Sequence, residues 1–225
     1  MSQSSTASPS GVGPLRDIIG SVTDAQTYRN LLYLFLSFPL GLVYFVLAVT
    51  GIALGIGLAV IGIGLAILLA TVIGLRAIAT FERRLANSLL GTTIAEPSDV
   101  DRRGNGVVDT AKAYLGAGST WRGIGFILLK FWLGVLSFVL LVSLLGTALE
   151  LILLPAAPGG AFNIHVVNWT VADTFRTSTQ RLLAVPLGVA LLLIALPMLN
   201  GFARVNASVA TSLLGPDGSE TGSKR

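Results

Sequence analysis

Long stretches without charged residues dominate the pattern of hydrophobic and polar positions in this chain. No charged residue lies at positions 31–75 or at positions 182–203. A third apolar run covers residues 131–154, and Glu150 is its only charged member. About 20 consecutive apolar residues cross the hydrocarbon core of a bilayer, so these runs predict transmembrane helices.

The first of these runs is too long for one span. As a single helix rising ~1.5 Å per residue, residues 31–75 would reach roughly 68 Å, more than twice the ~30 Å hydrocarbon core. Thr50 and Gly51 lie near its midpoint, and glycine adopts the backbone angles that tight turns require. We therefore predict that the chain folds back at Thr50 and Gly51.

The complete pattern predicts an all-α membrane protein whose four transmembrane helices form two tandem hairpins. The spans are expected at residues 31–49, 52–75, 131–154 and 182–203. Pro186 and Pro197 should kink the fourth span, where neighbouring helices can satisfy the carbonyl groups that a proline frees.

The segments outside the spans complete the domain organisation. A flexible tail is expected at residues 1–26, which are rich in Ser, Gly and Thr and poor in apolar residues. The four-span domain covers residues 27–215, with a cytoplasmic segment at 76–130 and an outer loop at 155–181. A short C-terminal tail follows at residues 216–225.

The distribution of Lys and Arg predicts the orientation in the membrane. All but two of the 15 Lys and Arg residues lie before the first span, between the second and third spans or after the fourth span, and the exceptions are Arg176 and Arg181. The positive-inside rule therefore predicts a multi-pass protein of the cell (plasma) membrane with both termini in the cytoplasm. The net charge of +4 therefore comes from basic residues that set the orientation of the spans, and no nucleic acid is expected as a partner.

Composition excludes several kinds of site. The chain has no cysteine and one histidine, so neither a thiolate centre nor a two-histidine metal site can form. No nucleophile, base and orienting group recur at a usable spacing. We expect no enzyme activity, no metal and no cofactor, with the lipid bilayer as the main partner.

An amphipathic pattern follows the second predicted span. Four apolar residues recur there at helical spacing: Ile78, Phe81, Leu85 and Leu89. Arg76, Arg83 and Arg84 take the other side. This predicts a cytoplasmic amphipathic helix on the inner membrane face, with its arginines near anionic headgroups. Such a helix is either an anchor or a transmission element that moves with the spans.

Small residues recur along the predicted second span. Gly51, Gly55 and Gly62 belong to a series whose spacing puts small side chains on one helical face. Such a face lets two helix backbones approach closely. It serves either packing within the chain or the seam of a homodimer.

Glu150, near the outer end of the third span, is a candidate sensing residue. A charged side chain held within the bilayer costs about 2.5–3.5 kcal/mol on insertion scales, so it is a site hypothesis by default. Arg176 or Arg181 could pair with it from the outer loop, and such a pair would respond to pH. The alternative is an interfacial carboxylate hydrated among the headgroups.

The outer loop contains the remaining candidates. His165 titrates near neutral pH and could report external pH. Trp169 and Phe162 either contact an external ligand or lie at the membrane interface as belt aromatics. Asp173 is expected to cap the helix that leads into the fourth span, and Asn168 begins a glycosylation sequon.

Two partial self-alignments indicate an internal duplication. One shift carries Phe38, Gly41 and Phe45 onto Phe131, Gly134 and Phe138. A second shift carries residues 85–91 onto residues 209–215. Both predicted hairpins start and finish inside, so we expect a parallel repeat rather than an inverted one.

With these elements the chain resembles the putative sensor domain family, which occurs ahead of histidine kinase modules in actinobacteria and in haloarchaeal membrane proteins. The similarity covers about residues 27–215. The residues that carry it are Tyr28-Arg29, Thr120-Trp121-Arg122, Trp169 with Asp173-Thr174, Pro186-Leu187-Gly188 and Leu213-Leu214-Gly215. The resemblance implies a signal-input role at the membrane.

Only residues 216–225 follow the last of these motifs, so we expect no kinase domain in the chain itself. A signal would then pass to a cytoplasmic signalling protein. Two other functions remain open, a small transporter, channel or transporter subunit, and a membrane scaffold. A transport pathway should display polar residues within the spans, and few are present.

Overall fold

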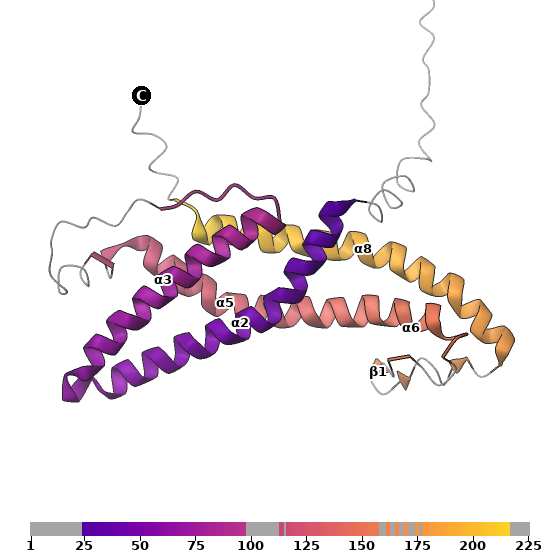
Figure 1. Ribbon diagram of the computed structural model, residues 1–225, viewed down its shortest axis with the longest axis horizontal. Coiled ribbons are helices and arrows are strands. Elements are labelled where there is room, and N and C mark those ends of the chain that lie inside the picture. Colours follow the sequence, from indigo (N-terminus) through magenta and orange to yellow (C-terminus); the bar gives the residue numbers. More distant parts are fainter. Residues whose placement is uncertain are drawn as a thin grey trace, which may run out of the picture. The chain divides into compact units, whose positions relative to one another are not determined.

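Four long helices dominate the described part of the chain. The computed structural model describes residues 24–97, 113–114, 116–157, 161–162, 165–166, 169–170, 174–175 and 177–216. Within these residues the helices long and apolar enough to cross a membrane are α2 (Ala25–Gly57), α3 (Ile63–Leu89), a third helix at Gly118–Leu153 and α8 (Ser178–Leu214) (Figure 1). The all-helical membrane class predicted from the sequence is confirmed.

The third helix is built from three segments. It begins as α5 (Gly118–Leu141), continues through the π-helical turn η2 (Val142–Gly146) and ends as α6 (Thr147–Leu153). A π-helical turn inserts extra backbone into an α-helix and is often found at functional sites. Together these segments contain all but the last residue of the apolar run predicted at residues 131–154.

The first hairpin turns later than predicted. α2 continues through Thr50 and Gly51, and the chain reverses over the short helix η1 (Ala59–Ile61). Gly62 then has a φ of 82°, a left-handed conformation that glycine adopts at no steric cost. The turn predicted at Thr50 and Gly51 is therefore wrong. No polar residue marks the reversal in this apolar run, and Gly62 supplies the required backbone angle.

The small residues predicted to share one helical face belong to two different elements. Gly51 and Gly55 lie in α2, whereas Gly62 lies in the turn. A Cβ atom at Gly51 would collide with Thr71 of α3, and one at Gly55 would collide with Leu68. These two glycines therefore pack α2 against α3 within the chain.

The larger of two compact units comprises Arg29–Leu141 and Gly201–Arg225. Most of its buried apolar residues form one cluster: Tyr33, Tyr44, Ala48, Leu75, Ala79, Ala86, Ile94, Phe126, Ile127, Ala210 and Leu214. Apart from Ile94, which follows α3, they come from α2, α3, α5 and the end of α8, so all four helices contribute to this core.

Helices α3 and α5 run in the same direction where they touch. Arg76 of α3 contacts Thr120 of α5, and the Cβ of Ala79 lies against Gly123, so residue numbers rise together along both helices. In an up-and-down bundle, consecutive helices are antiparallel. The larger unit is therefore not a simple up-and-down bundle.

The segment predicted as a separate amphipathic helix is the C-terminal part of α3. The helix runs from Ile63 to Leu89 without interruption. Ile78, Leu85 and Leu89 pack against the protein core, whereas Phe81 is half exposed. The amphipathic segment is thus continuous with α3, and its location on the inner membrane face stays a prediction.

The smaller unit comprises Met1–Tyr28 and Val142–Asn200. Its apolar cluster contains Leu151, Leu154 and Ala184, with Phe175 and Leu191 packed against them. The loop before α8 holds two short antiparallel strands, β1 (His165–Val166) and β2 (Trp169–Thr170).

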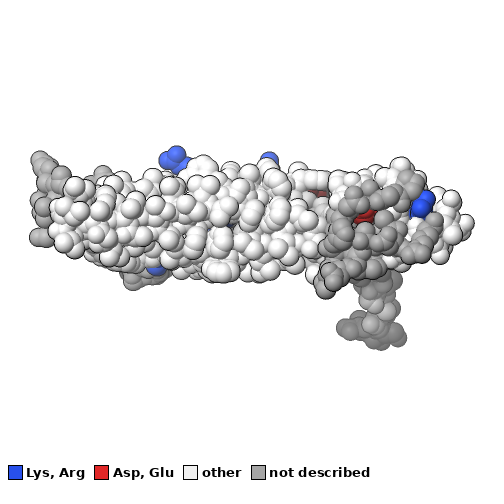
Figure 2. Space-filling view, turned by 90° about the horizontal axis from the view of Figure 1, so that it is seen from below, with Lys and Arg blue, Asp and Glu red and all other residues white. Residues whose placement is uncertain are grey.

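Large apolar side chains are exposed along the helices. Val60, Leu65 and Trp132 have 96%, 67% and 66% of their surface exposed. Figure 2 shows a face on which uncharged residues cover most of the described surface, with charged atoms at only a few points. Lipid is the solvent that suits such a surface, because a soluble monomer rarely exposes large contiguous apolar patches.

Candidate functional site

A lysine and a glutamate form an ion pair that is fully buried in the larger unit. The Nζ atom of Lys130 lies 2.5 Å from the Oε1 atom of Glu82, and both side chains are 0% exposed. Lys130 belongs to α5 and Glu82 to α3, so the pair joins the two helices. Two ionised groups removed from water are stable only with good geometry and further hydrogen bonds.

Two tyrosines of α2 supply those further hydrogen bonds. The hydroxyl group of Tyr33 donates to Glu82 Oε1 at 2.8 Å and accepts a hydrogen bond from Lys130 Nζ at 2.6 Å. The hydroxyl group of Tyr44 lies 3.4 Å from the other carboxylate oxygen, a longer and weaker contact. We call these four residues the buried cluster; it connects α2, α3 and α5 at one point.

The helix periodicity places both charges in the middle of buried faces. In α3, Glu82 lies between the buried residues Ala79 and Ala86, three and four positions away, which is the spacing of one helical face. In α5, Lys130 lies between the buried residues Ile127 and Gly134. The sequence prediction missed this site because it assigned Lys130 to the cytoplasmic flank and did not weigh Glu82. The signal was there, since each charge falls on an apolar stripe.

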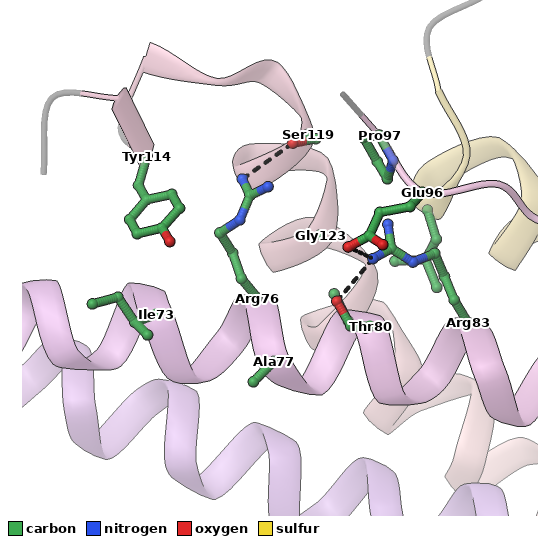
Figure 3. Close-up of a pocket in the computed structure, with 12 residues that line it drawn as sticks. Ile73, Arg76, Ala77, Thr80, Arg83, Glu96, Pro97, Tyr114, Ser119 and Gly123 are labelled. Carbon is green, nitrogen blue, oxygen red and sulfur yellow. Dashed lines mark hydrogen bonds and ion pairs between the residues drawn. The ribbon is translucent and has the colours of Figure 1, made fainter. Parts of the chain in front are cut away.

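A polar pocket lies along another face of α3. Its volume is about 410 Å³. Arg76, Thr80 and Arg83 line it at positions i, i+4 and i+7 of the helix. Ser119 lines it from the first turn of α5 and Tyr114 from the segment before α5 (Figure 3). We call this cavity the arginine pocket.

Both arginines of this pocket are held in place by the protein. Arg76 Nη1 donates hydrogen bonds to the hydroxyl oxygens of Ser119, at 3.1 Å, and of Thr120, and its guanidinium group lies 5.1 Å from the centre of the Tyr114 ring. Arg83 Nη2 donates to Thr80 Oγ1 at 2.8 Å and lies 3.6 Å from Glu96 Oε1. The two guanidinium groups thus have fixed positions in the same cavity.

The three arginines were expected to lie near lipid headgroups, and this expectation stays a prediction. Arg76 and Arg83 line the arginine pocket, and the side chain of Arg83 is only 10% exposed. Arg84 is exposed, as its predicted place on the outer side of the helix requires.

Glu150 is buried in the smaller unit, with 0% of its surface exposed. Its Oε2 atom accepts a hydrogen bond from the backbone N–H of Phe162 at 2.7 Å, and its Oε1 atom has no hydrogen-bond partner among the described residues. Arg181, one of its two predicted partners, instead donates from Nε to the carbonyl oxygen of Phe175. The structure therefore brings Glu150 together with Phe162, whose side chain is 55% exposed.

The other outer-loop candidates are only partly described. The backbones of His165 and Trp169 belong to the two short strands, and their side chains lie outside the description. Asn168, Asp173 and Arg176 are also outside the described residues. In the part of the chain that is described, no three His, Cys, Asp or Glu side chains group as a metal site.

Four apolar helices of membrane-spanning length define the class of this chain as a multi-pass membrane protein. In a comparison with family models, residues 33–214 match the family described as "Putative sensor". The match covers most of the chain, which therefore belongs to this family. The comparisons with curated proteins and with solved structures give no match.

Proposed function

We propose that this protein is a signal-input module of the cell membrane whose sensing element is the buried cluster and whose signal passes to a cytoplasmic partner chain. Membership of the Putative sensor family supports a sensing role. The observation that carries the proposal is the fully buried ion pair between Lys130 and Glu82, because removing two charges from water costs free energy that an apolar pair would not cost.

The cluster has the properties of a two-state element. Neutralising either charge leaves the other one buried without compensation, which is strongly unfavourable. Tyr33, Glu82 and Lys130 come from three different helices, so relief of that cost requires the helices to shift or water to enter. A local change in charge or hydration is thereby converted into a change in helix packing, as in other protein switches.

In-membrane crosslinking tests the signalling role. A photo-crosslinking residue at the exposed position Arg84 would sample the cytoplasmic neighbourhood of α3 in native membranes. We expect the otherwise unchanged chain to capture a kinase, a response regulator or a transcription regulator, and the Glu82→Gln variant to alter the yield at least severalfold. A Ser88→Ala substitution, at an exposed position of the same helix, should leave the yield unchanged.

Two results would contradict the signalling role. One is capture of a transport ATPase as the main product. The other is solute-specific flux through the purified protein in reconstituted vesicles that Glu82→Gln abolishes, because a buried ionisable pair can also belong to a transport pathway.

We further propose that the two hairpins are a tandem duplication, as the sequence shifts indicate. At the crossing of α2 and α5, a Cβ atom at Gly41 would lie 2.8 Å from the carbonyl oxygen of Lys130, and one at Gly134 would collide with the carbonyl oxygen of Ser37. The first sequence shift carries Gly41 onto Gly134 and also Ser37 onto Lys130. The two contacts therefore join equivalent positions, with the roles of the two halves interchanged.

The stacked aromatic rings at this crossing are related by the same sequence shift. The rings of Phe38 and Phe138 stack with centroids 4.8 Å apart, and those of Phe45 and Phe131 stack at 4.6 Å. The first shift carries Phe38 onto Phe131 and Phe45 onto Phe138, so it turns one pair into the other. Such reciprocal contacts are those of a local two-fold relation between α2 and α5.

The contact between the second helix of one half and the first helix of the other half also occurs twice. Arg76 of α3 donates to the hydroxyl oxygen of Thr120, and Asn200 of α8 donates to that of Thr27 at 2.9 Å. The first shift carries Thr27 onto Thr120, and the second carries Arg76 onto Asn200. Each half therefore packs its second helix on the first helix of the other half.

The buried cluster departs from this repeat. The equivalent of Glu82 is Asn206, which is buried and donates to the carbonyl oxygen of Phe202, and the equivalent of Lys130 is Ser37. Both halves bury polar groups at these positions, but only one half carries charges. The fold thus accommodates neutral residues at the equivalent positions, Asn206 and Ser37. The charges of Glu82 and Lys130 are therefore not required for packing alone, which supports a functional role for the ion pair.

A further inference from the structure

We propose that the arginine pocket binds a ligand through a phosphate group. Arg76 and Arg83 line one cavity of about 410 Å³, and the hydroxyl groups of Thr80 and Ser119 lie between and beside them (Figure 3). Guanidinium groups bind phosphate oxygens through paired N–H donors, and hydroxyl groups add single hydrogen bonds. The cavity thus offers the donors that a phosphate group requires.

Both arginines retain donors for such a ligand. The bonds that hold Arg76 use Nη1, and those that hold Arg83 use Nη2. Toward the described residues, the Nε atoms and the other Nη atoms make no further hydrogen bond or ion pair. A guanidinium group has five N–H donors, so each arginine can stay anchored and still bind a ligand.

Glu96 is the acidic residue that lines the pocket, and it holds Arg83 weakly. Its side chain is 78% exposed, and its carboxylate lies 3.6 Å from the guanidinium nitrogen. An ion pair with one partner so exposed contributes little to stability. A phosphate group can therefore replace this carboxylate at Arg83 with a small loss.

The position of the pocket along α3 suits two sources of phosphate. Arg76 is the first charged residue after the uncharged run at 31–75, so the pocket begins where the apolar surface ends. Phospholipid headgroups lie where the apolar part of a bilayer ends. On the proposed topology, this end of the pocket also faces the cytoplasm and its soluble phosphorylated molecules. In both cases the chemistry that the pocket recognises is an anionic phosphate.

Binding measurements on the full chain in nanodiscs test this proposal and distinguish the sources. In phosphatidylcholine nanodiscs, calorimetric titration with inorganic phosphate and with pyrophosphate reports a soluble ligand. Native mass spectrometry with phosphatidylglycerol and cardiolipin, against phosphatidylcholine, reports a lipid ligand. We expect saturable binding in at least one arm, at constant ionic strength.

Substitutions locate the binding. Arg76→Gln should weaken binding about tenfold or more, because it removes a charge-assisted donor pair. Arg84→Gln, which removes the same charge from an exposed position of α3, should change it less than twofold. Glu96→Gln should tighten binding, since it removes the competing carboxylate, and this exposed substitution is compatible with folding even if changes at the more buried Arg83 are not.

Two outcomes overturn the proposal. One is the absence of saturable binding in every arm, and the other is an equal loss in Arg84→Gln and Arg76→Gln, which would indicate a diffuse electrostatic effect. Binding in the pocket does not depend on the signalling role. A chain that binds phosphate but captures no signalling protein would contradict the preceding proposal alone.

Discussion

A carboxylate and an ammonium group that are both removed from water stabilise a fold only while they remain together. Glu82 and Lys130 are in this situation, with Tyr33 bonded to both of them. Loss of one partner exposes the full desolvation cost of the other, whereas loss of both removes the cost as well. The two charges must therefore act as one unit.

Substitution of the pair tests this coupling. Lys130→Met and Glu82→Leu should each lower the free energy of unfolding by about 3–5 kcal/mol, whereas the double variant that combines them should recover most of that loss. Unfolding in mixed micelles by sodium dodecyl sulfate measures these energies. Arg84→Gln, at an exposed position, should stay within about 0.5 kcal/mol of the unchanged chain. Additive losses in the double variant would mean that the two residues act independently.

At the residue scale, the sequence identified charged residues in or beside apolar runs. It did not predict which groups these residues contact. Glu150 was singled out as a charge in an apolar run, and it is buried, but its bond is to the backbone of Phe162. Lys130 directly precedes an apolar run and was interpreted as a topological marker. Only three-dimensional packing shows that it faces Glu82, since their pairing depends on how α3 and α5 cross.

The helices themselves follow from the apolar runs, but the turn between the first two does not. Residues 31–75 contain no polar residue that would separate a turn from a span, so the midpoint was the natural estimate. Gly51 serves helix packing instead, against Thr71. The reversal at Gly62 depends on a left-handed backbone angle, and several glycines in this run could have supplied it.

At the scale of elements, the crossing of α2 and α5 tests the duplication. Gly41→Ala and Gly134→Ala should destabilise the protein by similar amounts, about 1–3 kcal/mol, because each Cβ atom would meet backbone of the other helix. Gly125→Ala is the matched control in α5, since a Cβ atom there meets nothing within 4 Å, and it should be neutral or stabilise by up to about 1 kcal/mol. Unfolding in mixed micelles measures all three variants. If Gly41→Ala and Gly134→Ala behave like the control, the close crossing is absent.

The molecule as a whole has the surface and the helix lengths of a multi-pass membrane protein, and this was predictable because hydrocarbon imposes simple rules of length and charge. The packing was less predictable. α3 and α5 run parallel at their contact, which no hydrophobic pattern indicates, because both helices would show the same apolar stripe in either direction. Orientation rests on the placement of Lys and Arg.

The proposed signalling role requires the connection between α3 and α5 to face the cytoplasm, as the placement of Lys and Arg predicts. The chain has no cysteine, so a single introduced cysteine reports its own side of the membrane. The most direct measurement labels Gly104→Cys and Gly160→Cys with a membrane-impermeant maleimide, in intact cells and in inverted vesicles. We predict that Gly160→Cys is labelled in intact cells and Gly104→Cys only in inverted vesicles. Labelling of both positions from the same side would contradict the four-span arrangement.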